Sequence, residues 1–147
     1  MVIAKQPCPS LAGIRVGWSD RDEWRHLTGL ALVGLVLAGG LAVLGLPSID
    51  LHGPLHRFGI MDPLCGMTRG LRDVMLGQLG RAVDYNPASP VLVMGAIGAV
   101  VRGMIGRLSG RWLTFRPPPT RSTLLALTGA LAALWVNQQL HAALLMG

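Results

Sequence analysis

The chain has 147 residues, of which 51% are apolar and only 14% are charged, and its formal net charge is +6. A soluble domain would carry nearly twice that share of charged residues, so the composition indicates an integral membrane protein. A strongly basic chain could also bind nucleic acid. The apolar residues fall in long runs, however, and arginines on one side of a membrane explain the charge without a nucleic-acid partner.

We expect an all-α integral membrane protein forming a single membrane domain, with three transmembrane helices and an amphipathic interfacial helix on the extracytoplasmic side. Residues 1–18 predict a flexible cytoplasmic arm. Ser19 and the acids after it suit an N-cap and a first turn, so a helix over 20–46 is expected to contain the first span. The uncharged part, 27–46, covers about 30 Å at about 1.5 Å per residue. No small-residue cleavage site follows it, which indicates an anchor and not a signal peptide.

The outer connection, 47–89, should contain structure, because long unstructured connections are uncommon in compact domains. Apolar residues recur at helical spacing from about 66 to 83, with charged residues on the other side. This pattern predicts an amphipathic helix on the outer membrane surface or on the bundle, with Gly80 as a possible break. Asn86 and Pro87 end that helix and precede the next span, which we expect Asn86 to cap.

The second half of the chain predicts two further spans. Residues 90–108 form the second, in which the long side chain of Arg102 can reach the lipid headgroups. Residues 109–122 form an Arg- and Pro-rich loop that predicts a cytoplasmic, interfacial turn in contact with anionic lipid. Residues 123–146 form the third span, which carries the polar residues Asn137, Gln138, Gln139 and His141.

The distribution of lysine and arginine predicts the orientation. Basic residues outnumber acids in the N-terminal arm and in the loop 109–122, whereas the two balance in the outer connection. Basic residues on short loops favour the cytoplasmic side. We therefore expect a multi-pass protein of the bacterial inner membrane, with its N-terminus in the cytoplasm and its C-terminus outside it.

Small residues mark two helix faces that are suited to close packing. Their members repeat every four positions and are Gly95, Ala99 and Gly103 in the second span and Gly129, Ala133 and Asn137 in the third. Such rows allow helices to approach closely in lipid. They serve packing either within the chain or against a larger partner, and the sequence leaves both alternatives open.

The outer connection carries a motif with a specific spacing. It reads Asp62-Pro63-Leu64-Cys65-Gly66-Met67-Thr68-Arg69, followed by Gly77, Ala82 and Tyr85-Asn86-Pro87. Over residues 47–95 it resembles the bacterial membrane proteins grouped as domain-of-unknown-function family 2752, whose hallmark is CP-x-CG-x-TR followed by a glycine-rich stretch and an N-P pair. The resemblance implies a short multi-span membrane protein and carries over no catalytic residue. Asp62 stands where the family has its first cysteine, so neither a dithiol redox pair nor a thiolate zinc site is expected.

Two readings of Arg69 are possible from the sequence. With Thr68 and Gly66 it could grip an anion at a glycine-opened helix start. The simpler alternative is an ion pair with Asp62 or Asp73 that ties the loop to the helix, and we favour it.

The histidines offer weak candidates for ligand binding. His52 and His56 lie near Cys65 in sequence and could contribute to a metal site, although Gly53 and Pro54 argue against a regular helix between them. His26 and His141 lie near span ends, where an imidazole could ligate a haem or a chlorophyll-type pigment. No cofactor is required by the sequence.

No pattern typical of a hydrolase, transferase or nucleotide-binding enzyme occurs. We therefore expect a non-enzymatic accessory or assembly subunit of a larger membrane protein complex, packed through its small-residue faces and its outer connection. The alternative is a small membrane protein that binds haem, pigment, metal or lipid through His141 or through His52, His56 and Cys65.

Overall fold

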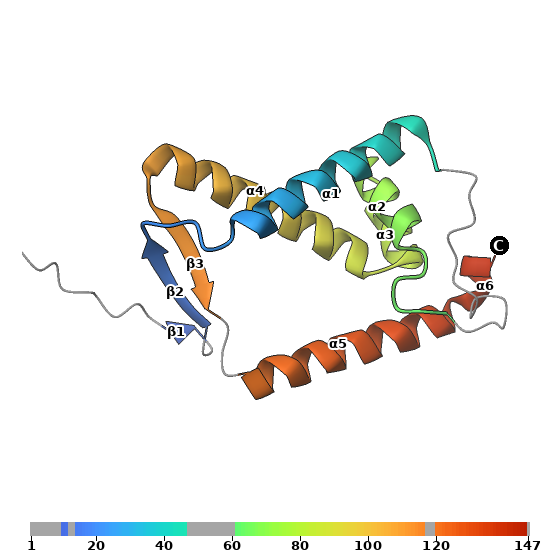
Figure 1. Ribbon diagram of the computed structural model, residues 1–147. Coiled ribbons are helices and arrows are strands. Elements are labelled where there is room, and N and C mark those ends of the chain that lie inside the picture. Colours follow the sequence, from blue (N-terminus) through green and yellow to red (C-terminus); the bar gives the residue numbers. More distant parts are fainter. Residues whose placement is uncertain (1–9, 12–13, 47–60, 117–119, 147) are drawn as a thin grey trace, which may run out of the picture.

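The computed structural model describes residues 10–11, 14–46, 61–116 and 120–146. It is mostly helical, as expected, and adds a small sheet at one end of the molecule (Figure 1). In chain order the elements are β1 (Ser10–Leu11), β2 (Ile14–Ser19), α1 (Arg25–Leu44), α2 (Met67–Met75), α3 (Leu79–Tyr85), α4 (Ala88–Ser109), β3 (Trp112–Arg116), α5 (Thr120–Leu140) and α6 (Ala142–Met146).

Among the described residues, α1 and α4 are the two helices that are long and apolar enough to cross a membrane, as the first and second predicted spans require. They run in opposite directions and cross (Figure 1). Gly103 permits the close approach, because a Cβ at this position would lie only 2.6 Å from the Thr28 methyl group. The small-residue row of the second span therefore faces α1 at Gly103, as expected for packing within the chain.

Helix α5 has 21 residues and extends from the sheet end of the molecule to the opposite end (Figure 1). In the part of the chain that the structure describes, it is not apolar enough to count with α1 and α4 as a candidate span. The third predicted span, 123–146, is also not one helix, because α5 ends at Leu140 and α6 begins after His141.

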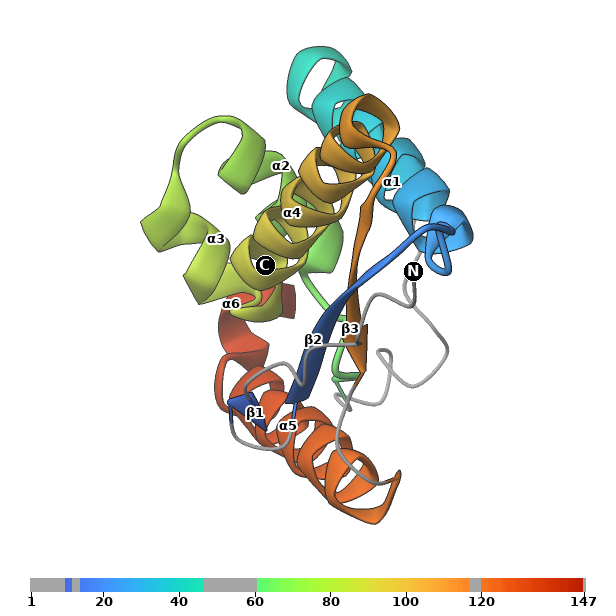
Figure 2. The same ribbon diagram turned by 90° about the vertical axis from the view of Figure 1, so that its left-hand side faces the viewer.

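The sheet corrects the all-α expectation. Strand β2 pairs antiparallel with β1 and with β3, with Gly17 opposite Thr114 and Trp18 opposite Leu113. The Thr114 hydroxyl also donates to the Gly17 carbonyl over 3.1 Å. Residues 10–11 and 14–18 are therefore strands and not a flexible arm, and the loop 109–122 contains their partner. Figure 2 shows β2 and β3 side by side at this end.

Arg102 does not extend toward lipid headgroups. It is only 8% exposed, and its guanidinium makes two 3.0 Å hydrogen bonds to one carboxylate oxygen of Asp22. Its Nε donates to the Leu113 carbonyl, and the group lies 6.0 Å from the Trp24 ring centre and 5.8 Å from that of Trp112. Arg102 thus joins α4 to β3 and to the segment before α1.

The segment before α1 is not the helical N-terminus that Ser19 and its acids predicted. The Ser19 hydroxyl accepts a hydrogen bond from the Arg21 amide, and Asp22 accepts one from the Trp24 amide. Helix α1 begins only at Arg25. The side chains expected to cap the helix instead shape the turn that leads from β2 into it.

The predicted amphipathic helix, 66–83, is two helices. The break lies at Gly77, where φ is +76°, and not at Gly80, which lies inside α3. Helix α2 packs on α1 and α4, with the Met75 methyl 3.8 Å from the position of a Cβ on Gly39. The apolar side of α2 therefore packs against other helices of this chain. The sequence predicted this placement as one of two, the other being the membrane surface.

Candidate functional site

Asn86 is the centre of the contact between Met61–Gly70 and Tyr85–Ser89, which we call the motif junction. It is 0% exposed, and its side-chain amide donates to the carbonyls of Pro63 (3.1 Å) and Cys65 (3.0 Å). Its Oδ1 accepts from the Ala88 amide at 3.0 Å, so the side chain caps the start of α4, as predicted. Its backbone N–H and C=O are bonded to Ala82 and Ser89. Every polar group of Asn86 is therefore paired.

Two glycines allow the two halves of the motif junction to meet. Gly66 has φ +73°, and a Cβ there would lie 2.7 Å from both the Tyr85 carbonyl oxygen and a methyl of Leu145. A Cβ on Gly70 would lie 2.3 Å from the Ser89 hydroxyl oxygen. Any larger residue at either position would force the helices apart, because real Cβ atoms do not approach this closely.

Asp62 has a structural role at the start of the motif. Its carboxylate accepts a hydrogen bond from the Leu64 amide at 2.7 Å, which forms the turn at Pro63. That turn directs the Pro63 carbonyl to Asn86. Asp62 thus shapes the loop that Asn86 contacts.

The side chain of Cys65 is a buried thiol. It packs with Met61, Leu145, Tyr85 and Ala142, and its Sγ lies 3.6 Å from the Met61 sulfur. Burial raises the pKa of the Cys65 thiol, and the nearby Asp62 carboxylate raises it further. A neutral, buried thiol is a poor nucleophile and a poor metal ligand, so the environment favours a packing role.

In the part of the chain that the structure describes, Arg69 forms an ion pair with neither Asp62 nor Asp73, the two partners predicted. Its guanidinium lies over the Tyr85 ring at 5.7 Å, which joins α2 to the end of α3. Asp73 is 2% exposed and lies instead 3.7 Å from Arg72 and 3.5 Å from Arg81. Thr68 is half-buried on α2. Arg69 therefore braces the two helices, although through a different partner from the one expected.

The end of α5 attaches to the motif junction at Met61. The Trp135 indole donates to the Met61 carbonyl at 2.8 Å, and the Met61 amide donates to the Gln139 side chain at 3.1 Å. Gln138 is 0% exposed, yet neither atom of its amide has a hydrogen-bond partner among the residues that the structure describes. Buried polar groups are usually paired, which makes Gln138 unusual.

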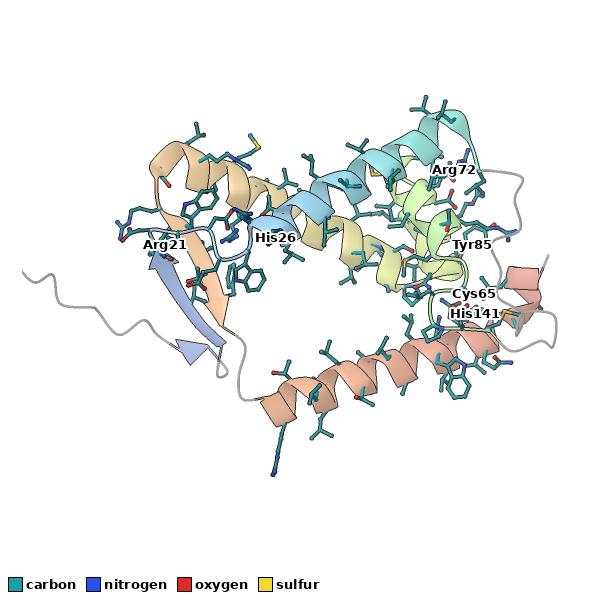
Figure 3. The ribbon with its side chains drawn as sticks, in the orientation of Figure 1. Arg21, His26, Cys65, Arg72, Tyr85 and His141 are labelled. Carbon is teal, nitrogen blue, oxygen red and sulfur yellow. The ribbon has the colours of Figure 1, made fainter. Side chains whose placement is uncertain are left out.

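The two candidate ligand histidines that the structure describes, His26 and His141, lie apart. Figure 3 labels His26 at the start of α1, toward the sheet end, and His141 at the far end of α5. The His141 Nδ1 lies 2.8 Å from the Asn137 backbone carbonyl oxygen, and the ring is exposed. Because a carbonyl only accepts, Nδ1 is the donor in this contact. His52 and His56 lie outside the described residues, and within the described ranges no three His, Cys, Asp or Glu residues gather as a metal site.

The sequence did not indicate which residues pack against the motif or around Arg102. Gly70 and Ser89 complete the motif junction, and Asp22 with Trp112 surrounds Arg102. The glycine at position 70, on the predicted helix and one residue from Arg69, was a signal of close packing. No sequence signal indicated the pairing of Asp22 with Arg102, because 80 positions separate them in the chain.

The fold and the motif junction define a small, mostly helical protein with two candidate membrane helices and a tightly packed segment between them in the sequence. The family model described as "Protein of unknown function (DUF2752)" matches residues 54–100, which include the motif junction and the first half of α4. This match confirms the family resemblance inferred from the motif. The comparison with curated proteins and the comparison with solved structures each gave no match.

Proposed function

We propose that this protein is a non-catalytic accessory or assembly subunit of a larger bacterial membrane protein complex. The observation that carries the proposal is the exposure of α5. Its 21 residues would cover about 31 Å at about 1.5 Å per residue, enough to cross a membrane as a third span. The large apolar side chains that α5 leaves exposed are Leu124, Leu125, Leu127, Leu131, Trp135, Val136 and Leu140.

The surface of α5 suits a partner helix better than lipid alone. A Cβ on Gly129 would meet nothing within 4 Å, and Ala133 is exposed on the same row. Small residues with polar neighbours such as Asn137 are typical of helix–helix contacts in membranes, where they permit close approach and interhelical hydrogen bonds. A partner helix along this row would cover the least apolar of the three long helices.

The arrangement of the ends supports the proposed orientation. Strands β2 and β3 pair, so the segments before α1 and after α4 lie on one side. The exposed basic residues of those segments and of the start of α5 are Arg21, Arg25, Arg107, Arg111 and Arg121. A cytoplasmic location for this end, in contact with anionic lipid, follows from the positive-inside rule. The motif junction and the C-terminus would then lie outside the cytoplasm.

The motif junction supports a structural role. Asn86 has no polar atom left for a substrate, and the Cys65 thiol is buried with a raised pKa. Such a rigid outer segment would hold the membrane helices in the relative positions that a partner recognises.

The test is photo-crosslinking in native membranes. A photoreactive residue at Gly129 or Ala133 should give a discrete higher-mass adduct, whereas the same residue at Val36, an exposed position on α1, serves as the matched control. Native gels of protein solubilised in gentle detergent should show a species larger than the lone chain. Migration as a lone chain, with no adduct at either α5 position, would overturn the proposal.

A second function is supported by His141. Its Nδ1–H is held by the Asn137 carbonyl, an arrangement typical of ligand histidines, and its Nε2 is left for an axial bond to haem or a chlorophyll-type pigment. An absorption spectrum of the purified protein tests this. A Soret or pigment band that disappears in His141→Ala, but persists in His26→Ala, would support ligation by His141; a featureless spectrum would exclude it.

A further inference from the structure

One face of the sheet, which we call the aromatic face, consists of Val16, Trp18, Leu113 and Phe115. These side chains share a face because Trp18 is paired with Leu113 and Val16 with Phe115, and successive strand residues alternate between faces. Trp18 is 56% exposed and Phe115 is 38% exposed. The Trp24 ring, directly before α1, lies 6.4 Å from the Phe115 ring, centre to centre. The aromatic face therefore adjoins the start of α1 and leaves two large apolar side chains exposed.

The opposite face of the sheet packs against α4. The Trp112 ring lies where a side chain at Gly106 would be, because a Cβ there would overlap it. Thr114, on the same face as Trp112, is only 7% exposed. Arg102 of α4 donates to the Leu113 carbonyl at the edge of β3. The sheet thus lies beside the last two turns of α4 (Figure 1), and its aromatic face is turned away from that helix.

The contacts with α4 set the depth of the sheet relative to a membrane. Helix α4 has 22 residues, which cover about 33 Å at about 1.5 Å per residue, whereas a hydrocarbon core is about 30 Å thick. The two contact positions, Gly106 and Arg102, precede the last residue of α4, Ser109, by about 5 Å and about 10 Å. With α4 spanning the bilayer as proposed, the sheet lies where hydrocarbon meets headgroups, and not in bulk water.

The side chains at the sheet end suit this depth. Tryptophan is enriched at membrane–water interfaces, where its ring is buried and its N–H stays hydrated. The Arg111 guanidinium lies 5.8 Å from the centre of the Trp18 ring, so a positive charge borders the aromatic face. Arg21 and Arg107 are also exposed at this end. An apolar face with a basic border complements an anionic lipid surface, in which phosphates lie outside the hydrocarbon.

We propose that the aromatic face is inserted into the headgroup region of the adjoining lipid leaflet, with Trp18 and Phe115 among the lipids and Arg111 at the level of the phosphates. The inference rests on the membrane location of α1 and α4 in the proposed function, and it is independent of the accessory role and of His141. The sheet then fixes the depth of the α1–α4 pair. Movement outward exposes aromatic rings to water, and movement inward brings arginines into hydrocarbon.

Spin labels test the depth of the aromatic face. Full-length chains without the native cysteines carry one labelled cysteine, at Trp18 or Phe115, in vesicles of phosphatidylethanolamine and phosphatidylglycerol. Val36, exposed on α1, is the matched lipid control, and Asp20, exposed directly after β2, is the matched water control. The ratio of collisions with oxygen to collisions with a water-soluble nickel chelate should exceed the Asp20 value by at least about threefold at Trp18, Phe115 and Val36. Circular dichroism verifies that each labelled chain is folded.

A second measurement keeps the sheet aromatic. Trp18→Phe removes one of the four tryptophans, so the difference between wild-type and variant fluorescence is the emission of Trp18. Phospholipids brominated near the glycerol should quench this emission at least about twofold, and acrylamide in the water should quench it little.

Two results would overturn the proposal. One is a collision ratio at Trp18 and Phe115 equal to that at Asp20, and the other is Trp18 emission that acrylamide quenches and brominated lipid does not. Either result means that water, or a partner protein missing from the vesicles, covers the aromatic face. A collision ratio at Val36 equal to that at Asp20 would overturn the membrane location as well. Crosslinking at α5 is unaffected by the first two results, so the accessory role is tested separately.

Discussion

Asn86 holds the motif junction together through its side chain, which bonds to Pro63, Cys65 and Ala88. Asn86→Ala leaves two carbonyls and one amide of a buried site without partners. Each such group costs about 1–3 kcal/mol, so we expect the free energy of unfolding to fall by about 3 kcal/mol or more. Chemical denaturation in detergent, followed by circular dichroism, measures the change.

A matched control for Asn86 is Asn137→Ala. Asn137 is half-buried, and the contact that its backbone carbonyl makes with His141 survives the substitution. We expect this variant to lose less than about 1 kcal/mol. Equal losses in the two variants would contradict the central role of Asn86.

The Cys65 thiol makes the free energy of unfolding depend on pH in the alkaline range. Because its pKa is raised in the folded state, the unfolded chain releases the proton first as pH rises, and folding is then favoured less. The contribution is fully present below the ordinary thiol pKa and is lost between that value and the raised one. Replacing Cys65 with Ala should remove this part of the pH dependence, as measured by melting temperatures across alkaline pH in a Cys8→Ser background. An identical pH dependence with and without the thiol would contradict the raised pKa.

Arg102 and Asp22 form a buried ion pair whose members depend on each other. Asp22→Ala leaves the guanidinium without its carboxylate, which costs about 3–5 kcal/mol in comparable buried pairs. Arg102→Leu keeps apolar volume beside Trp24 and Trp112. In the double variant we expect the losses to be less than additive by at least about 1 kcal/mol, as measured by a double-mutant cycle of unfolding free energies. Additive losses would show that the two side chains act independently.

The contact between α2 and α4 depends on the absence of a side chain at Gly70. Gly70→Ala places a Cβ within 3 Å of both Ser89 side-chain atoms, so we expect a loss of about 1–3 kcal/mol in unfolding free energy. Adding Ser89→Gly removes both clashing atoms and should restore part of the loss. Gly80→Ala is the control: its Cβ meets nothing within 4 Å, and alanine favours the helix by about 1 kcal/mol. Failure of Ser89→Gly to improve Gly70→Ala would contradict this packing.

The elements that could be predicted from sequence are those whose structure is determined by residues close together in the chain. The long apolar runs of α1 and α4 are recognisable as helices, because only a helix pairs its own backbone groups in lipid. The break at Gly77 depends on a left-handed residue, and Gly80 was an equally plausible site in the sequence. The sheet has no local cause, since β2 is stabilised by a strand that lies 97 positions later at the Gly17–Thr114 pair.

The same distinction holds for the candidate site. The capping role of Asn86 was predictable because Pro87 and the apolar run beside it mark a helix start. Its two bonds to Pro63 and Cys65 were not, because they join segments whose approach depends on the glycines between them. The partner of Arg69 was missed for a similar reason. A carboxylate was the obvious expectation, and only the end of α3 brings the Tyr85 ring under the guanidinium.

At the scale of the whole molecule, the sheet predicts which distant residues can be cross-linked. Gly17 and Thr114 are paired in register, and a Cβ on Gly17 would lie 3.7 Å from the Thr114 side-chain oxygen. We expect Gly17→Cys/Thr114→Cys, in a chain lacking Cys8 and Cys65, to form a disulfide on mild oxidation. The pair Gly17→Cys/Leu113→Cys should not, because adjacent strand residues point to opposite faces. Mobility on a non-reducing gel after cleavage between the two positions reports the bond, and equal yields from both pairs would contradict the register.

The pairing of β2 with β3 also bears on how the chain is made. Translation produces β2 before α1, and β3 only after α4 is complete. With α1 and α4 spanning the bilayer as proposed, the sheet can close only once both helices have entered it in opposite directions, since otherwise β3 would emerge on the wrong side. Closure is also possible before α5 has been synthesised. In the proposed arrangement the strands thus make biogenesis stepwise: a helical hairpin forms and is secured at its sheet end, and α5 is added to an already ordered pair.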